Sequence, residues 1–457
     1  MSRTLALTMS MMAILSTACV PIREIRTYLS TADSDAQAPS HYLSAPILSK
    51  QCNTGSATPE ENKSIIEDYG NYLIGYAEFD DQGWSYAQDA QLEALRSRLK
   101  LDLANSAYDD MDFAVIVFVH GWHHNAHEND CNVQEMRQMV HLASERFEAA
   151  YHEGKLQRKR RVFGIYAAWR GESVDADLLR YTTVIDRRDA AEKVAKGSIR
   201  QLLANLHEQE IAARANSTRT TAADRATRMY TTVVGHSFGG LIVFNGLSQE
   251  LIDELTAECT PDHSIAAAAS LERVWPDEVV LINPAFEASR FEPLNRLAES
   301  AAACARPRML PVLTVVTADN DKWTGPVFTV GRRVLTLFEG YDTSTPETRA
   351  REKDANIHAI GFVDRYRTHR LCLKTTNGTT TVAVAPTPSI AGAAPSPPSR
   401  PVWVVGAPPT IVNGHDGFLY ARSSGSTPQP YLLEWLISIH IPPGNAPIAA
   451  NACGAWR

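Results

Sequence analysis

Long hydrophobic runs are absent from this 457-residue chain beyond its first 20 residues. A membrane-spanning helix needs about 20 consecutive apolar residues, so no later segment is expected to span a membrane. Blocks of like charge are also missing, although the net charge is −8. A nucleic-acid partner is therefore not expected. No internal repeat is found.

Cysteine is scarce, and no C-x-x-C pair indicates a zinc or dithiol redox motif. The seven cysteines are Cys19, Cys52, Cys131, Cys259, Cys304, Cys372 and Cys453. With Cys19 set aside as a lipid acceptor, six remain. In an exported chain these allow up to three disulfides, with the pairing left open.

The N-terminus indicates export. Residues 1–18 contain one early positive charge, a short apolar run and then small residues, as a secretory signal peptide does. Ser16-Thr-Ala18-Cys19 resembles a bacterial lipobox, with serine where leucine is usual. We expect a membrane-anchored lipoprotein of the bacterial cell envelope, lipidated at Cys19; the alternative is cleavage after Ala18 to give a periplasmic or secreted protein. Residues 19–66 are polar and predict a tether or loosely packed extension.

Residues 67–457 alternate between strand and helix patterns, and 44% of the chain is apolar, enough for a sizeable core. Strands are predicted at residues 72–79, 113–119, 161–168, 230–234, 278–282, 311–316 and 402–405. Helices are predicted at 86–103, 133–147, 187–215, from 241 onward and from 427 onward. This alternation predicts the α/β class, with one mostly parallel sheet and helices on both faces.

The sequence also predicts three local features. Ser85 and Gln88 are expected to form a capping box for the helix at 86–103. Residues 322–371 are irregular by pattern and are expected to form a lid or excursion. Residues 381–401 are rich in Ala, Pro and Ser and predict a flexible insertion.

The stretch Gly235-His-Ser-Phe-Gly239 lies between a predicted strand and a predicted helix. It matches the G-x-S-x-G nucleophile elbow, in which glycines stand where side chains would collide. The sharp turn exposes the Ser237 hydroxyl above the sheet. It also places the N–H of Phe238 at a helix N-terminus, where it can stabilise an oxyanion.

Polar residues follow several other predicted strands. Ligands bind at the carboxyl ends of strands in such sheets, so these residues are expected to meet: His120-Gly-Trp122, Ser237, Asp319, Asp321 and His415. A serine nucleophile needs a general base, and the base needs a carboxylate to fix its tautomer. The chain supplies them in the order Ser, Asp, His.

From about residue 70 to the C-terminus the chain resembles the α/β-hydrolase superfamily, specifically a serine esterase- or lipase-like member. The resemblance is carried by Gly235-His-Ser-Phe-Gly239, His120-Gly-Trp122, Thr317-Ala-Asp-Asn-Asp321 and Asn413-Gly-His415. It implies the α/β-hydrolase fold and a carboxylic ester hydrolase that forms an acyl-enzyme on Ser237, with His415 as base. It also implies an oxyanion hole from the N–H groups of Trp122 and Phe238, a small-molecule or lipid ester as substrate, and no cofactor. The exported N-terminus, the insertion and the unclear lid depart from the family pattern.

The acid is the least determined member of the triad. Asp319 and Asp321 both lie a few residues past a strand; Asp321 is favoured because the turn needs length to reach the histidine. His358 and His369 are weaker candidates for the base, since they fall in the excursion. His236 is expected to pack or hydrogen-bond beside the serine.

Two further groups of residues are candidates for a functional role. Histidines and possible ligands gather after the strand at 113–119: His120, His123, His124, His127, Glu128, Asp130 and Cys131. They lack the helical i, i+4 presentation of H-E-x-x-H, so we expect them to hydrogen-bond within the loop, without a metal. Aromatic residues near strand ends are candidates for an acyl or alcohol pocket: Trp122, Trp169, Phe238, Phe286 and Trp323.

Other functions remain open on sequence alone. A non-catalytic envelope lipoprotein on the same fold is one, and an acyltransferase, peptidase or thioesterase using the same triad is another. An aspartate-nucleophile dehalogenase or epoxide hydrolase is disfavoured, because the elbow carries Ser237.

Overall fold

The computed structural model describes residues 23–28, 62–171, 184–215, 229–258, 275–304, 311–387, 400–419, 429–441 and 453. The predicted signal peptide, the expected lipid acceptor Cys19 and the predicted helix start at 427 lie outside them. None of the described helices is long and apolar enough to cross a membrane.

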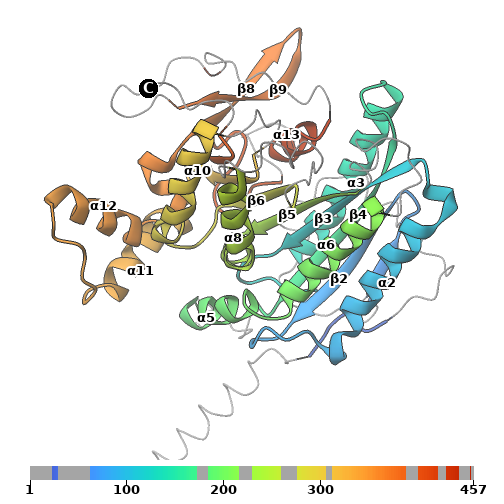
Figure 1. The fold of residues 1–457 in the computed structure, drawn as a ribbon, viewed down its shortest axis with the longest axis horizontal. Helices are drawn as coiled ribbons and strands as arrows, with labels where there is room; N and C mark the ends of the chain where they lie inside the picture. Colours follow the sequence, from blue (N-terminus) through green and yellow to red (C-terminus); the bar gives the residue numbers. More distant parts are fainter. Residues whose placement is uncertain are drawn as a thin grey trace, which may run out of the picture.

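The described residues form a ten-stranded sheet (Figure 1). Its strands are β1 (Ile66–Asp68), β2 (Tyr72–Phe79), β3 (Met111–Val119), β4 (Lys159–Trp169), β5 (Met229–His236), β6 (Glu278–Ile282), β7 (Leu313–Ala318), β8 (His369–Thr376), β9 (Thr379–Pro386) and β10 (Val402–Ala407). Their order is β1-β2-β4-β3-β5-β6-β7-β10-β8-β9. The pairs β1–β2 and β8–β9 at the two edges are antiparallel, and every pair between them is parallel.

Helices cover both faces of the sheet (Figure 1). They are α2 (Ala90–Ala104), α3 (Cys131–His152), α5 (Val184–Val194), α6 (Ile199–Ala215), α8 (Phe238–Glu258), α10 (Glu292–Cys304), α11 (Phe328–Leu335), α12 (Pro346–Ile357) and α13 (Tyr431–Ser438). One apolar core joins the sheet to α2, α5, α6, α8 and α10, and a second joins it to α3 and α13. Because the strands are buried on both faces, their sequences are continuous apolar runs. The predicted α/β class is confirmed.

Two helix predictions are wrong in detail. The capping box does not form, because the backbone turns left-handed at Gln88 (φ 54°) and Asp89 (φ 66°) and Ser85 bonds to the Asp89 carboxylate instead. The predicted helix at 187–215 is two helices. The break lies where Gly197 and Gly83 touch: a Cβ on Gly197 would lie 2.1 Å from the Gly83 carbonyl oxygen.

The expected excursion and insertion are more ordered than the pattern indicated. Residues 322–371 contain α11, α12 and short helical turns at Trp323–Val327, Ile360–Phe362 and Asp364–Tyr366. The expected insertion at 381–401 begins inside β9, which pairs with β8 across a turn at Asn377 and Gly378, both with positive φ. A disulfide joins Cys372 on β8 to Cys453. Residues 388–399 lie outside the described part.

Both described ends of the expected tether at 19–66 pack on the body. Arg26 is fully buried, and its guanidinium donates to Glu67 at 3.1 Å and stacks on the Tyr76 ring at 3.8 Å. Arg137 of α3 donates to the same carboxylate at 2.6 and 3.0 Å. Burial alone raises the pKa of Glu67, but Arg137 and Arg26 outweigh it and lower the pKa from 4.5 to about 2. This buried ionic cluster attaches the N-terminal segment to β1 and α3.

Replacing Glu67 with glutamine should remove the carboxylate that two buried guanidinium groups share and cost about 3–5 kcal/mol of unfolding free energy near pH 7. The folded-state pKa of about 2 lies below the usual 4.5, so the contribution of Glu67 is present above pH 4.5 and is lost as the pH falls toward 2. Urea unfolding across this range measures both effects. Glu93→Gln, at an exposed position on α2, is the control. An equal loss in both variants, or a difference that does not shrink in acid, would contradict the assignment.

Candidate active site

The turn from β5 into α8 holds Ser237 in a left-handed conformation, with φ of 55°. Its N–H donates to the Ile282 carbonyl of β6 at 3.0 Å. Glycines on both sides allow the backbone to close. A Cβ on Gly239 would lie 2.0 Å from the Val119 carbonyl oxygen, and one on Gly235 would lie 2.6 Å from the carbonyl oxygen of Gly239. Larger residues at either position would push the strand and helix apart.

The structure brings three of the predicted residues into one hydrogen-bonded line. His415 Nε2 lies 2.8 Å from Ser237 Oγ, and His415 Nδ1 lies 2.8 Å from Asp321 Oδ2. With Nδ1 protonated toward the carboxylate, Nε2 accepts the hydroxyl proton. The serine comes from the end of β5, the aspartate from the turn after β7, and the histidine from the loop after β10.

The Asp321 carboxylate is held as an anion. It is buried and accepts hydrogen bonds from the backbone N–H groups of Trp323 (2.8 Å) and Thr324 (3.3 Å), and from the Thr324 hydroxyl. Burial favours the neutral acid, but the hydrogen bond and charge of His415 and the Thr324 hydroxyl outweigh it, so the pKa of Asp321 lies below its usual value. Burial lowers the pKa of His415, yet Asp321 raises it above 6.5 overall.

Asp319, the alternative acid, faces another way. Its carboxylate accepts from Arg367 at 3.4 Å and from Arg370 at 3.1 Å. The other candidate bases also have different partners. His358 Nδ1 pairs with Asp354 Oδ1 at 2.8 Å, and the buried His369 ring bonds to the Thr368 hydroxyl. Of the predicted alternatives, Asp321 and His415 are the pair that reaches Ser237.

The loop after β3 lies directly against the serine. A Cβ on Gly121 would lie 2.9 Å from Ser237 Cβ, so the peptide that leads into Trp122 borders the hydroxyl. Phe238 is the first residue of α8, and N–H groups of a first helical turn have no acceptor within the helix. Both backbone segments therefore border Ser237, as the expected oxyanion hole would require.

The histidine-rich loop is held by hydrogen bonds. His120 Nδ1 donates to the Gly121 carbonyl, and its Nε2 accepts from the Trp169 N–H at 3.1 Å. Burial lowers the pKa of His120 to about 4. Although burial also lowers the pKa of His124, the nearby Asp130 carboxylate, 3.0 Å away, raises it to about 9. The hydrogen bonds of these imidazoles hold the loop in place.

Among the described residues, one group has the spacing of a set of metal ligands: His236, His415 and Asp416. This group lies outside the histidine-rich loop. Both ring nitrogens of His415 already bond to Ser237 and Asp321, so a metal there would have to break the line of three residues. These residues fit a metal poorly in this conformation.

Asn283 is a site residue that the sequence analysis did not identify. It lies fully buried just after β6 with φ of 44°, and its amide donates to the carbonyls of His415 (2.7 Å) and Gly414 (3.1 Å) while accepting from the Ala318 N–H. His236 Nε2 donates to the same His415 carbonyl at 3.0 Å. The sequence signal that could have identified Asn283 is its position directly after a strand, at the carboxyl end of the sheet where Ser237 also lies.

The expected aromatic pocket is only partly formed at the site. Trp122 lies near Phe238 and Trp323, with ring centroids 6.4 and 6.3 Å apart. Trp169 is buried against His120. Phe286 is fully buried and stacks on Phe244. Trp169 and Phe286 are therefore core residues.

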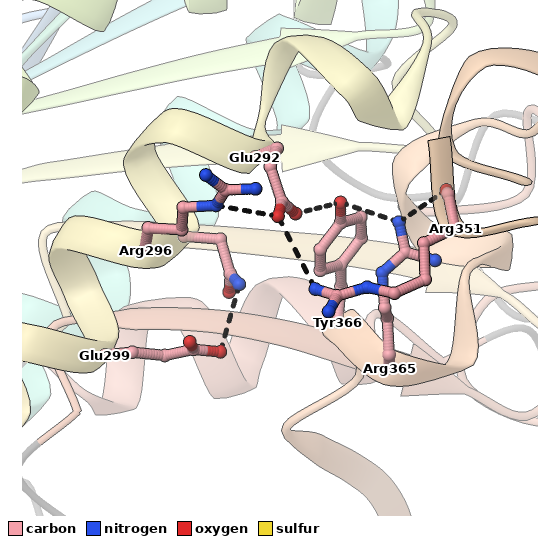
Figure 2. A pocket seen from close by; sticks show the side chains of 7 residues that line it. Glu292, Arg296, Glu299, Arg351, Arg365 and Tyr366 are labelled. Atoms are coloured by element: carbon pink, nitrogen blue, oxygen red, sulfur yellow. Dashed lines mark hydrogen bonds and ion pairs between the residues drawn. The ribbon is translucent and has the colours of Figure 1, made fainter. Parts of the chain in front are cut away.

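A cavity of about 450 Å³ lies away from this site, beside α10 and α12. Figure 2 shows that its side chains bond to one another. Glu292 accepts from Tyr366 and Arg296, and Arg365 donates to the Tyr366 hydroxyl. These charged groups already pair among themselves, and the triad-like geometry lies elsewhere.

Replacing Asp321 with asparagine removes the anion that raises the pKa of His415. The rate at which Ser237 reacts with a fluorophosphonate should rise with pH as His415 deprotonates, with a midpoint above 6.5. In Asp321→Asn the midpoint should move to lower pH, and the plateau should fall by about 10⁴-fold because the tautomer is no longer fixed. Asp319→Asn is the control and should keep the parental midpoint and the parental plateau rate. A midpoint that moves only in Asp319→Asn would reverse the two roles.

Comparisons with known proteins add little to this geometry. No family model and no curated protein matches the chain. A structure of phospholipase PlaB from Legionella pneumophila in complex with thio-NAD is similar at 15% identity, covering 61% of this chain and 50% of PlaB, with a TM-score of 0.21. A second structure of the same phospholipase is similar at 12% identity, covering 74% and 63%, with a TM-score of 0.27. This chain thus spans about half to somewhat under two thirds of PlaB, and TM-scores this low support no inference about function.

Proposed function

We propose that the protein is a serine hydrolase that cleaves carboxylic esters through an acyl-enzyme intermediate. The observation that carries this proposal is the continuous line from Asp321 through His415 to Ser237, with both contacts at 2.8 Å. A serine hydroxyl is a weak nucleophile alone and gains reactivity from an oriented base of this kind.

In this mechanism Ser237 Oγ attacks the ester carbonyl while His415 Nε2 takes the hydroxyl proton. Asp321 remains ionised and stabilises the imidazolium. The N–H groups of Phe238 and Trp122 hold the oxyanion of the tetrahedral intermediate. His415 then gives its proton to the leaving alkoxide, which departs as the alcohol. In the second half a water molecule attacks the acyl-enzyme and gives a proton to His415. The bond to Ser237 Oγ then breaks, His415 returns the proton to that oxygen, and the carboxylic acid leaves.

The surroundings of the serine favour an apolar acyl or alcohol group in the substrate. Trp122, Phe238 and Trp323 gather beside it, and aromatic side chains commonly line such pockets. We place the enzyme in the bacterial cell envelope, anchored through Cys19, on the strength of its lipobox-like N-terminus.

Replacing Ser237 with alanine should lower the turnover of short p-nitrophenyl esters by about 10⁶-fold, because the triad acts as a unit. Initial rates measured with purified protein, together with loss of fluorophosphonate labelling, test this expectation. Ser289→Ala, at an exposed serine, is the matched control and should retain both activities. Parental turnover by the Ser237→Ala protein would rule out the proposal.

Replacing Gly121 with alanine tests the oxyanion arrangement. The added methyl would lie 2.9 Å from Ser237 Cβ and 3.1 Å from His236 Nδ1, so the loop that carries the Trp122 N–H must move. We expect turnover to fall by about 10²–10³-fold, the usual effect of losing one oxyanion donor. Gly340→Ala, at an exposed glycine with no atom within 4 Å of its Cβ position and no positive φ, controls for a glycine change as such. An unchanged turnover in Gly121→Ala would remove this loop from the mechanism.

A further inference from the structure

Helix α11 projects from the body together with α12, at the side of the molecule away from α2 and α3 (Figure 1). None of its eight residues is buried. Of the thirteen large apolar side chains that are exposed among the described residues, seven fall between positions 323 and 338: Trp323, Val327, Val330, Val334, Leu335, Leu337 and Phe338. Exposed apolar residues concentrated in this way mark an interaction surface.

The apolar residues of this segment lie mainly on one side of the helix. Val327, Val330 and Val334 recur at intervals of three and four, which is the spacing of one helix face. Leu337 and the fully exposed Phe338 follow in the next turn. A helix this short is marginal in water on its own. It is held from the opposite side, where Arg332 donates to Glu287 at 2.7 Å and to the Asn356 carbonyl at 3.1 Å.

The charge of the segment favours an anionic partner. Residues 322–338 contain Lys322, Arg332 and Arg333 and no acidic residue, in a chain whose net charge is −8. Arg332 pairs with Glu287, and Glu339, the next residue, accepts from the Asn356 amide. Lys322 and Arg333 are exposed, and neither forms an ion pair with any described residue. Basic side chains beside an exposed apolar face are typical of helices that lie in an anionic lipid interface.

The apolar segment also leads to the candidate site. Trp323 follows Asp321 by two positions, donates its backbone N–H to that carboxylate, and meets the Trp122 ring edge-on at 6.3 Å. A lipid surface that covers α11 would therefore reach the aromatic residues beside Ser237.

We propose that the exposed face of α11, from Val327 to Phe338, docks on an anionic lipid bilayer and so presents membrane-borne esters to Ser237. The second half of this statement rests on the proposed hydrolase function, whereas the docking does not. The lipid surface is chosen over a second copy of the chain because the exposed basic residues Lys322 and Arg333 lie beside the apolar face.

Co-sedimentation with vesicles tests the docking. All proteins are full chains that carry Cys19→Ser, so that no acyl anchor contributes. The parent should bind vesicles of mixed phosphatidylglycerol and phosphatidylcholine at least about tenfold more tightly than vesicles of phosphatidylcholine alone. V330D/V334D should weaken binding to the mixed vesicles by about tenfold or more. Hydrolysis of a soluble short ester should be unchanged, which also shows that this variant folds.

The matched control is L101D/I211D, which places the same charges at equally exposed apolar residues of α2 and α6 and should bind as the parent does. Phe338→Asp, at a fully exposed position, should weaken binding without affecting folding. Parental vesicle binding by V330D/V334D and Phe338→Asp would overturn the proposal. So would a parent dimer that these changes separate while vesicle binding persists, since α11 would then be a contact between copies.

The two proposals fail separately. Ser237→Ala should bind vesicles like the parent. If it does, while the parent shows neither fluorophosphonate labelling nor ester hydrolysis, then docking stands and the hydrolase function does not.

Discussion

The left-handed turn at Ser237 is the constraint on which the site depends. A non-glycine residue held at positive φ costs on the order of 1–3 kcal/mol, and it persists only where the surrounding structure determines it. Here β5 enters the turn between β3 and β6, and α8 leaves it with its apolar residues buried in the core. The Ala285 N–H donates to the Ser237 carbonyl at 3.1 Å. The large core therefore supports a conformation that the turn could not hold by itself.

The same architecture explains how residues far apart in the chain meet. His415 lies 178 positions after Ser237 and 94 after Asp321. All three nevertheless follow the carboxyl ends of parallel strands, which lie on the same side of the sheet. Additional amides fix the approach of the loops. Asn283 bridges the His415 loop to the end of β7, and Asn320 accepts from the Gly414 N–H at 2.8 Å. The positions of acid and base are thus set by the sheet and by amide side chains.

The sequence pattern was sufficient to predict those strands that are buried on both faces of the sheet. The apolar runs of β3 and β6 and the glycines of the elbow follow directly from packing, so the strands and the turn at Ser237 could be predicted. The edge hairpin β8–β9 was missed although Asn377-Gly378 is a strong turn signal, because its strands are half exposed and lack an apolar run. Asn283 was missed because its role depends on a carbonyl more than 130 positions away. The distinction between Trp169, a core residue, and Trp323, a half-exposed one, likewise required tertiary structure.

The placement of α11 relative to the site follows from one buried carboxylate. Burial raises the pKa of Glu287, but Arg188, Arg332 and Arg290 outweigh it and hold the pKa below its usual value. These arginines come from α5, α11 and the turn before α10, so the anion joins these three segments through ion pairs. A helix without any fully buried residue gains little from the core, so these polar contacts contribute to its orientation. Because they act on the side opposite the valines, they leave the apolar face directed outward while the chain just before it supplies Asp321 to the site.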